Sequence, residues 1–114
     1  RNRSMARQFE VFVIKDAEND LFDIYSYIAR HDTVENADYV FNAIQDSILG
    51  LSAFPSRGHV PPELERIGIF EYLEVRFKPY RIIYQVRDDE IYVHCILDGR
   101  RSLQELLQER LIRA

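Results

Sequence analysis

Apolar and polar residues alternate along much of the stretch 69–101, which is the pattern of β-strands with one buried face. Two breaks divide the stretch into three strands: Lys78-Pro79 follows the first, and Asp88-Asp89 follows the second. Asp tolerates the positive φ angles of two-residue hairpin turns, and proline cannot continue a central strand. The sequence therefore predicts a three-stranded meander joined by two tight hairpins.

Counting outward from the two turns predicts the register of these strands. The expected pairs are Phe77–Tyr80, Arg76–Arg81, Val75–Ile82, Leu73–Tyr84, Val86–Ile91, Tyr84–Val93, Ile82–Cys95 and Arg81–Ile96. Neighbours along a strand point to opposite faces, so the register sorts the side chains into two sets. One set is apolar and needs a covering layer: Leu73, Val75, Phe77, Tyr80, Ile82, Tyr84, Val86, Ile91, Val93, Cys95 and Leu97. The other set is mostly polar, and we expect it to lie on an open face that carries the function: Tyr72, Glu74, Arg76, Arg81, Gln85, Arg87, Tyr92, His94 and Asp98, with Ile83 and Ile96 among them.

Two stretches before the meander have apolar residues at helical spacing, and they predict a helical hairpin. Asp16 is the expected N-cap of the first helix. Asp32 with Glu35 has the form of a capping box for the second helix, which is expected to end at Phe54-Pro55. The two apolar stripes consist of Ala17, Leu21, Ile24, Tyr25 and Ile28, and of Ala37, Val40, Phe41, Ile44, Ile48 and Leu51.

The remaining segments complete an α+β fold. Residues 8–14 are rich in Val and Phe and predict an N-terminal strand. The segment 55–68 holds three prolines and two glycines, so we expect a surface loop. Leucines at 103, 106, 107 and 111 predict a short C-terminal helix. The expected architecture is an N-terminal strand, a helical hairpin packed on a mainly antiparallel four-stranded sheet, and a short C-terminal helix.

Length and composition favour a single soluble domain over residues 5–114 of this 114-residue chain. Residues 1–4 precede Met5 and are expected to be a cloning remnant or an upstream extension.

No run of about 20 apolar residues and no signal peptide is visible, so we expect no membrane partner. The single Cys95 cannot form a disulfide framework, which suits a reducing cytoplasm. The three histidines lie far apart in the sequence, and we expect no metal and no cofactor.

The formal net charge of −4 lowers the expectation of nucleic-acid binding, because proteins that grip phosphates are usually basic. Arginines that act on a ligand would therefore have to do so as a local cluster. Arg76 and Arg81 are the first candidates, since like charges opposed across a hairpin destabilise a sheet unless an anion lies between them. Glu74 or Asp98 could supply that anion internally, or an external ligand could supply it.

Two further sites are candidates. Arg100 and Arg101 follow Gly99 after the last strand, either as part of a solvated turn or as functional cations. Arg101 lies near the start of the final helix, where the helix dipole disfavours a cation, and this favours a functional role. His94 is either a general base or a packed, hydrogen-bonded side chain.

Five segments carry a recognisable combination of motifs: KDAENDLFDIYSYIA, the helix end at Phe54-Pro55, PELERIGIFEY, FKPYRIIYQV and ILDGRR. In this combination the chain resembles the RelE/ParE superfamily of toxins from bacterial type II toxin–antitoxin modules, over nearly its whole length from about residue 8. PYRIIY followed by a hairpin strand and GRR is a fairly specific signature of that superfamily. Two different activities share its fold, so fold alone does not assign the function.

If the chain belongs to the RelE branch, the resemblance implies that it cuts messenger RNA on the ribosome. Members of that branch use basic residues on the sheet and an aromatic hydroxyl near the C-terminus. On this resemblance, Arg81 and Arg101 are retained, and a ribonuclease would use Arg81, Arg101, Arg76 and His94. Tyr72 and Glu74 stand where that branch carries lysines, and Leu107 stands near its tyrosine. A glutamate opposes the charge stabilisation that phosphoryl chemistry requires.

If the chain belongs to the ParE branch, the resemblance implies that it inhibits DNA gyrase and is not an enzyme. Members of both branches are neutralised by a cognate antitoxin. We expect this antitoxin to fill an apolar groove along the helical hairpin or the sheet edge. We therefore predict a ParE-like toxin that inhibits growth and acts in plasmid stabilization. The alternatives are a ribosome-dependent endoribonuclease and an inactive, toxin-derived binding protein. The expected target-binding residues are Arg76, Arg81, Arg100, Arg101, Tyr72 and Tyr92.

Overall fold

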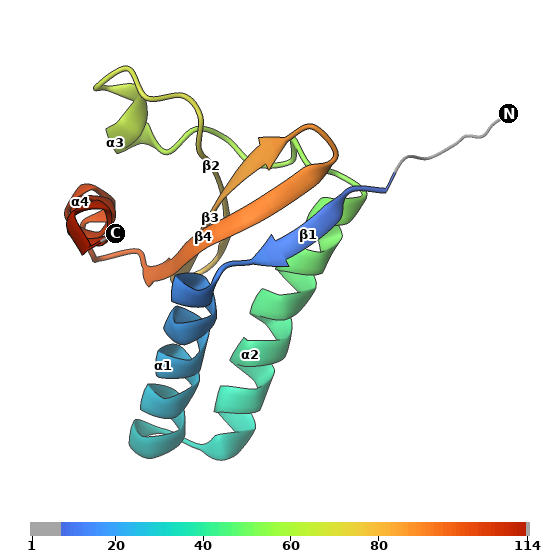
Figure 1. The fold of residues 1–114 in the computed structure, drawn as a ribbon. Helices are drawn as coiled ribbons and strands as arrows, with labels where there is room; N and C mark the ends of the chain where they lie inside the picture. Colours follow the sequence, from blue (N-terminus) through green and yellow to red (C-terminus); the bar gives the residue numbers. More distant parts are fainter. Residues whose placement is uncertain (1–7, 114) are drawn as a thin grey trace, which may run out of the picture.

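The computed structural model describes residues 8–113, with side chains through residue 110 (Figure 1). Residues 1–4, for which we expect a cloning remnant or an upstream extension, lie outside these limits. The side chain of Leu111, which we predict to belong to the C-terminal helix, also lies outside them. The elements in chain order are β1 (Glu10–Val13), α1 (Lys15–His31), α2 (Val34–Leu49), a 3-10 turn (Gly50–Ser52), α3 (Pro62–Glu65), β2 (Leu73–Phe77), β3 (Tyr80–Arg87), β4 (Glu90–Asp98) and α4 (Leu103–Arg113). The predicted α+β architecture is confirmed.

The four strands form one sheet in the order β1-β4-β3-β2. β1 pairs in parallel with β4, from Glu10 opposite Glu90 to Val13 opposite Val93. The pairs β2–β3 and β3–β4 are antiparallel, so the sheet is mainly antiparallel as predicted. β1 and β2 are the edge strands, because each has only one neighbour in the sheet.

Both predicted hairpins are present. The peptide bond between Lys78 and Pro79 is cis, and Phe77 faces Tyr80 across that turn. Asp88 has a φ of +54°, a left-handed conformation that Asp tolerates better than most residues. The predicted β2–β3 register is confirmed at every pair, and the β3–β4 register is confirmed from the turn as far as Tyr84 opposite Val93.

Beyond that pair the predicted register of β4 is wrong. Cys95 faces Ile83 rather than Ile82, and Ile96 faces Ile82 rather than Arg81. The cause is a β-bulge: His94 is an extra residue in β4 between the pairs Ile83–Cys95 and Tyr84–Val93. Because side chains alternate with a period of two, one extra residue reverses the face of every later position.

The helical hairpin covers one face of the sheet, as predicted. Figure 1 shows α1 and α2 side by side, extending away from the strands. The bulge places Ile96, rather than Cys95 or Leu97, in this core. Its buried members are Ala17, Leu21, Val40, Ile44, Ile48, Leu51, Val75, Ile82, Tyr84, Ile91, Val93 and Ile96.

The opposite face is not open, which corrects the expectation from the sequence. α3 and α4 lie over it and form a second core with members of β3 and β4. Cys95 and Leu97 point into this core because of the bulge. Its buried members are Leu64, Ile83, Cys95, Leu97, Leu103 and Leu106. The segment 55–68 is therefore not a simple surface loop, because the short helix α3 buries Leu64 within it.

The two predicted helix caps need correction. The N-cap of α1 is Ile14, which makes no side-chain capping bond. The N-cap of α2 is Thr33, whose hydroxyl accepts the backbone N–H of Asn36 at 3.0 Å, while Asp32 accepts the side-chain amide of Asn36. α2 and its 3-10 extension end before Phe54-Pro55, as predicted. Within residues 8–113 no helix is both long and apolar enough to cross a membrane.

We predict that Ile82→Ala destabilises the protein by about 2–5 kcal/mol, the usual cost of emptying a fully buried aliphatic site. Ile82 is 0% exposed, in the core under the helical hairpin. Val86→Ala is the matched control on the same strand, because Val86 is 37% exposed. Urea unfolding monitored by circular dichroism measures both variants, and equal losses would contradict the burial of Ile82.

Candidate functional site

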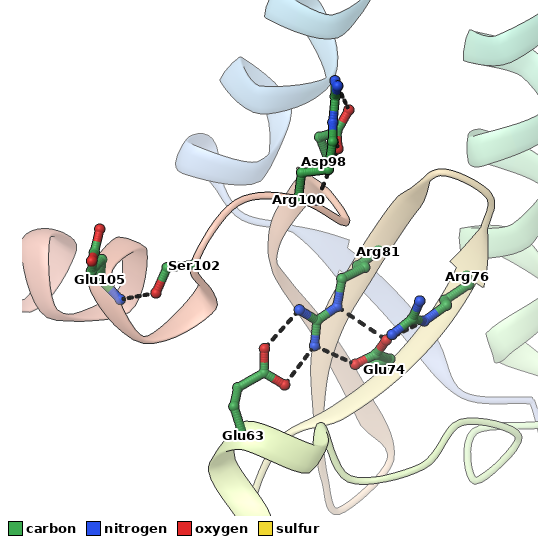
Figure 2. A network of polar contacts seen from close by, with 8 residues as sticks. All are labelled: Glu63, Glu74, Arg76, Arg81, Asp98, Arg100, Ser102 and Glu105. Atoms are coloured by element: carbon green, nitrogen blue, oxygen red, sulfur yellow. Dashed lines mark hydrogen bonds and ion pairs between the residues drawn. The ribbon is translucent and has the colours of Figure 1, made fainter.

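Arg81 in β3 lies at the centre of a buried ion network (Figure 2). Its Nη1 and Nη2 atoms donate to the two carboxylate oxygens of Glu63 at 2.7 and 2.8 Å. Its Nη2 and Nε atoms donate to the two carboxylate oxygens of Glu74 at 2.7 and 3.1 Å. All three nitrogens of this guanidinium are therefore engaged by carboxylates, and Arg81 is only 4% exposed.

Glu74 resolves the like-charge problem between Arg76 and Arg81. The two arginines face each other across the β2–β3 hairpin, and the Glu74 carboxylate contacts both. Nε of Arg76 donates to Glu74 at 2.6 Å, and Glu74 itself is fully buried. Of the alternatives left open by the sequence, the anion is thus internal and is supplied by Glu74, while Asp98 pairs elsewhere.

The second carboxylate, Glu63, comes from α3. Hydrogen bonds from Arg81 lower the pKa of the Glu63 carboxyl, and partial burial opposes that effect. The same contacts raise the pKa of Arg81, so both groups stay charged at neutral pH. Sequence reasoning missed Glu63 because it lies in the proline-rich segment. The available signal was Pro62 followed by Glu-Leu-Glu, since proline at the first position is a helix-start feature.

Arg100 and Arg101 occupy a separate place, after β4. Arg100 donates through its backbone N–H, Nε and Nη2 to the Asp98 carboxylate at 2.9–3.1 Å. Its hydrogen bonds lower the pKa of Asp98, although the Arg100 side chain remains 90% exposed. Arg101 is also exposed and lies directly before Ser102, whose hydroxyl accepts the backbone N–H of Glu105 in the first turn of α4. Figure 2 shows the Arg100–Asp98 ion pair apart from the Arg81 network.

His94 and Tyr72 lie together in a third place. Nε2 of His94 is 2.7 Å from Oε1 of Gln85, and this amide oxygen also accepts a hydrogen bond from Arg87. The ring of Tyr72 meets the His94 ring edge-on, with centroids 5.5 Å apart. Burial, and secondarily Arg87, lowers the pKa of His94, so the imidazole is neutral at pH 7. The packed, hydrogen-bonded description of His94 fits these contacts.

Tyr92 lies towards the β1 edge of the sheet. Its ring stacks on Phe12 with centroids 5.4 Å apart, and its hydroxyl donates to Glu90. The guanidinium of Arg87 lies 5.9 Å from the ring centroid.

The site residues named from the sequence are thus distributed over separate parts of the molecule rather than gathered in one catalytic set. Residues 8–110 contain no group of three or more His, Cys, Asp or Glu side chains placed to hold a metal ion.

Comparisons with known proteins agree on one family. Residues 11–103 match the family model described as the ParE toxin of the type II toxin–antitoxin system parDE. Toxin ParE3 of Caulobacter vibrioides is 26% identical over 96 residues, which cover 84% of this chain and 92% of that protein.

Two solved structures share the fold. The chromosomal ParDE toxin–antitoxin system from P. aeruginosa matches with a TM-score of 0.67 and 17% identity, over 81% of this chain and 97% of that chain. The toxin–antitoxin complex RelBE2 from Mycobacterium tuberculosis matches with a TM-score of 0.61 and 17% identity, over 84% and 97%.

We predict that Glu63→Gln lowers the free energy of unfolding by about 1.5–3 kcal/mol at pH 7, the usual range for hydrogen bonds to a charged partner. The pKa of Glu63 is lowered in the folded state, so its contribution is complete above the ordinary value of about 4.5 and is lost as pH falls through the folded-state pKa. Urea unfolding at several pH values measures the difference between wild type and variant.

The matched control for this prediction is Glu65→Gln, because Glu65 lies in the same short helix and is exposed. This control should change stability by less than about 0.5 kcal/mol. A difference between wild type and Glu63→Gln that does not shrink towards pH 3 would contradict the role of the charged carboxylate.

Proposed function

The chain belongs to the family of ParE toxins of type II toxin–antitoxin systems, and on that basis we propose that it inhibits DNA gyrase and is neutralised by a cognate antitoxin. The match to the ParE family model supports the choice of target. The likeness to the RelBE2 complex is a likeness of fold at 17% identity, so it does not argue for RNA cleavage.

The observation that carries this proposal is the position of Glu74. In a RelE-like ribonuclease the corresponding position is expected to hold a lysine, which stabilises charge on the phosphate. Here a fully buried carboxylate occupies it and binds Arg81 through two hydrogen bonds. A phosphodiester approaching Arg81 would meet this carboxylate and that of Glu63, and both repel it.

This arrangement of charges would strongly lower the rate of RNA cleavage. Losing one preorganised contact to a developing charge typically lowers a rate by about 10²–10³. Tyr72 and Glu74 both stand where lysines are expected, and the half-buried Leu107 has no hydroxyl for proton transfer. These departures support a protein that acts by binding its target rather than by cutting RNA.

We assign the contact with gyrase to the exposed cations among the six predicted target-binding residues, namely Arg76, Arg100 and Arg101. Arginine is common at the energetic centres of protein interfaces because its planar guanidinium forms several directed hydrogen bonds. Arg81 is buried, so its part in this proposal is to hold Glu74 and thereby orient Arg76. Tyr72, which meets the His94 ring, and Tyr92, which stacks on Phe12, stay in this proposal as predicted target contacts.

We place the antitoxin in an apolar groove beside β1. The groove has a volume of about 670 Å³ and is lined by residues of β1 and of both helices of the hairpin. Val13, Phe22 and Leu49 expose 38%, 67% and 60% of their surface there. β1 is an edge strand, so its outer backbone groups can pair with an added strand. The two solved structures with this fold belong to a ParDE toxin–antitoxin system and to a RelBE2 toxin–antitoxin complex, which supports an antitoxin partner.

We predict that the purified toxin blocks supercoiling by gyrase and causes accumulation of cleaved DNA, without codon-specific cleavage of messenger RNA in cells. A supercoiling assay and primer extension of cellular messages measure the two activities side by side. Arg100→Glu with Arg101→Glu should weaken inhibition tenfold or more, whereas Arg30→Glu on α1 should not. Codon-specific cleavage with normal supercoiling would establish the ribonuclease instead, and absence of both activities would establish an inactive binding protein.

We predict that Phe22→Asp weakens binding of the antitoxin encoded beside this toxin by tenfold or more, because it places a charge in the apolar groove. Isothermal titration calorimetry measures the affinity. Phe70→Asp is the matched control, since Phe70 is 60% exposed but does not line the groove. Equal affinities of the two variants would show that the antitoxin binds elsewhere.

A further inference from the structure

Negative charge is concentrated in the helical hairpin. Residues 15–49 hold two cations, Lys15 and Arg30, against eight carboxylates, a formal charge of −6 in a chain whose total is −4. Asp20 is buried and paired with Arg110, which leaves seven carboxylates and two cations, a charge of −5, outside the core. These seven are Asp16, Glu18, Asp23, Asp32, Glu35, Asp38 and Asp46. The hairpin is therefore an acidic element in a chain whose other residues are net positive.

The apolar groove beside β1 belongs to this acidic element. The charged side chains that line it are Glu18 and Asp38, and none of its described lining residues is a lysine or an arginine. Lys15 lies 3.4 Å from Glu18, but both side chains of that ion pair are largely exposed, so it is readily exchanged for another. Asp38 accepts a hydrogen bond from the hydroxyl of Tyr25 at 2.7 Å, which leaves its charge in place. A partner that fills the groove must therefore cover two carboxylates.

The groove runs along the axes of the two helices. Its lining residues recur every three or four positions, which places them on one side of each helix. They are Glu18, Leu21, Phe22 and Tyr25 on α1, and Asp38, Phe41, Asn42, Gln45, Ile48 and Leu49 on α2. From Asp38 to Leu49 this stripe is about 16 Å long at the rise of an α-helix. A groove of this length between two helices suits a third helix laid along them.

The two carboxylates lie at separate levels of the groove. Tyr25 is seven residues after Glu18 on α1, which corresponds to two turns and a rise of about 10 Å. The hydrogen bond from Tyr25 ties Asp38 to that level of the hairpin. The side chains of Leu21 and Phe22 line the groove on α1 between the two levels. A helix in the groove would thus meet an apolar surface with a carboxylate towards each end.

We propose, on the basis of the antitoxin site proposed above, that the segment of the antitoxin that fills the groove is a cationic amphipathic helix. Its apolar side packs on Leu21 and Phe22. Two Lys or Arg side chains, about seven positions apart, pair with Glu18 and Asp38. Covering these carboxylates without cations would be unfavourable, because a charge removed from water needs a partner. A second copy of this chain does not suit the groove, since its own hairpin is equally acidic and like charges repel.

The rate of association with the antitoxin encoded beside this toxin tests the charge, by stopped-flow fluorescence at low and high salt. Glu18→Lys together with Asp38→Lys should slow association tenfold or more at low salt. The two rates should converge at high salt, because salt screens exposed charges and electrostatic steering acts on the association rate. Thermal unfolding checks that the variant is folded. Unchanged or faster association of this variant would overturn the proposal.

The matched control is Glu35→Lys together with Asp46→Lys. Both residues are exposed on α2 and neither lines the groove, so this variant changes the charge of the hairpin by the same amount at other positions. It should slow association less than about threefold, because the effect of an exposed charge falls off within about 8 Å at physiological salt. Equal slowing of the two double variants would overturn the contact with Glu18 and Asp38.

A second arm identifies the segment itself. Hydrogen exchange of the antitoxin, alone and in the complex, locates the part that the toxin protects, and Phe22→Asp shows which protection depends on the groove. We expect that part to carry two Lys or Arg about seven positions apart. A protected segment with net negative charge would overturn this inference and leave the groove as the antitoxin site. Equal affinity of Phe22→Asp and Phe70→Asp would instead overturn the site itself. A toxin dimer that Phe22→Asp dissociates in sedimentation would place a second copy in the groove, against the proposal.

Discussion

A single extra residue in β4, His94, determines how both faces of the sheet are built. The bulge leaves backbone groups that no strand neighbour satisfies, and two distant side chains take their place. The buried carboxylate of Asp20 in α1 accepts the N–H of Ile96 at 3.0 Å, and Arg110 in α4 donates to the carbonyl of His94 and to Asp20. Buried backbone polar groups without partners are costly, so this ion pair ties both helices to the bulge.

The bulge also explains why the sheet has two cores. Before it, the inward residues of β4 face the helical hairpin. After it, Cys95 and Leu97 face the other way and give α3 and α4 an apolar surface to pack on. Packing of Leu64 then brings Glu63 to within 2.7–2.8 Å of Arg81. The buried network is therefore a consequence of the register shift, and it removes Arg81 from the exposed surface.

The parts of the fold that sequence reasoning predicted are those encoded locally. Lys78-Pro79 and Asp88 specify their turns through backbone preference alone, and the register is correct for as far as each turn controls it. The bulge could not be predicted in this way, because its partners Asp20 and Arg110 lie 76 and 16 residues from the groups they satisfy. For the site, opposed arginines at 76 and 81 correctly indicated an anion between them. Glu63, 18 residues from Arg81, became visible only in the folded chain.

The distribution of the remaining charge bears on how such a protein recognises a partner. Burying Arg81 between two carboxylates satisfies it internally, and a charge so enclosed adds nothing to long-range attraction. Exposed cations such as Arg57, Arg76 and Arg100 lie at the β2 edge and after β4, on a chain whose total charge is negative. At physiological salt, exposed charges act over only about 8 Å. Recognition must then come from local contacts of these groups, and net charge is a poor guide to what the surface binds.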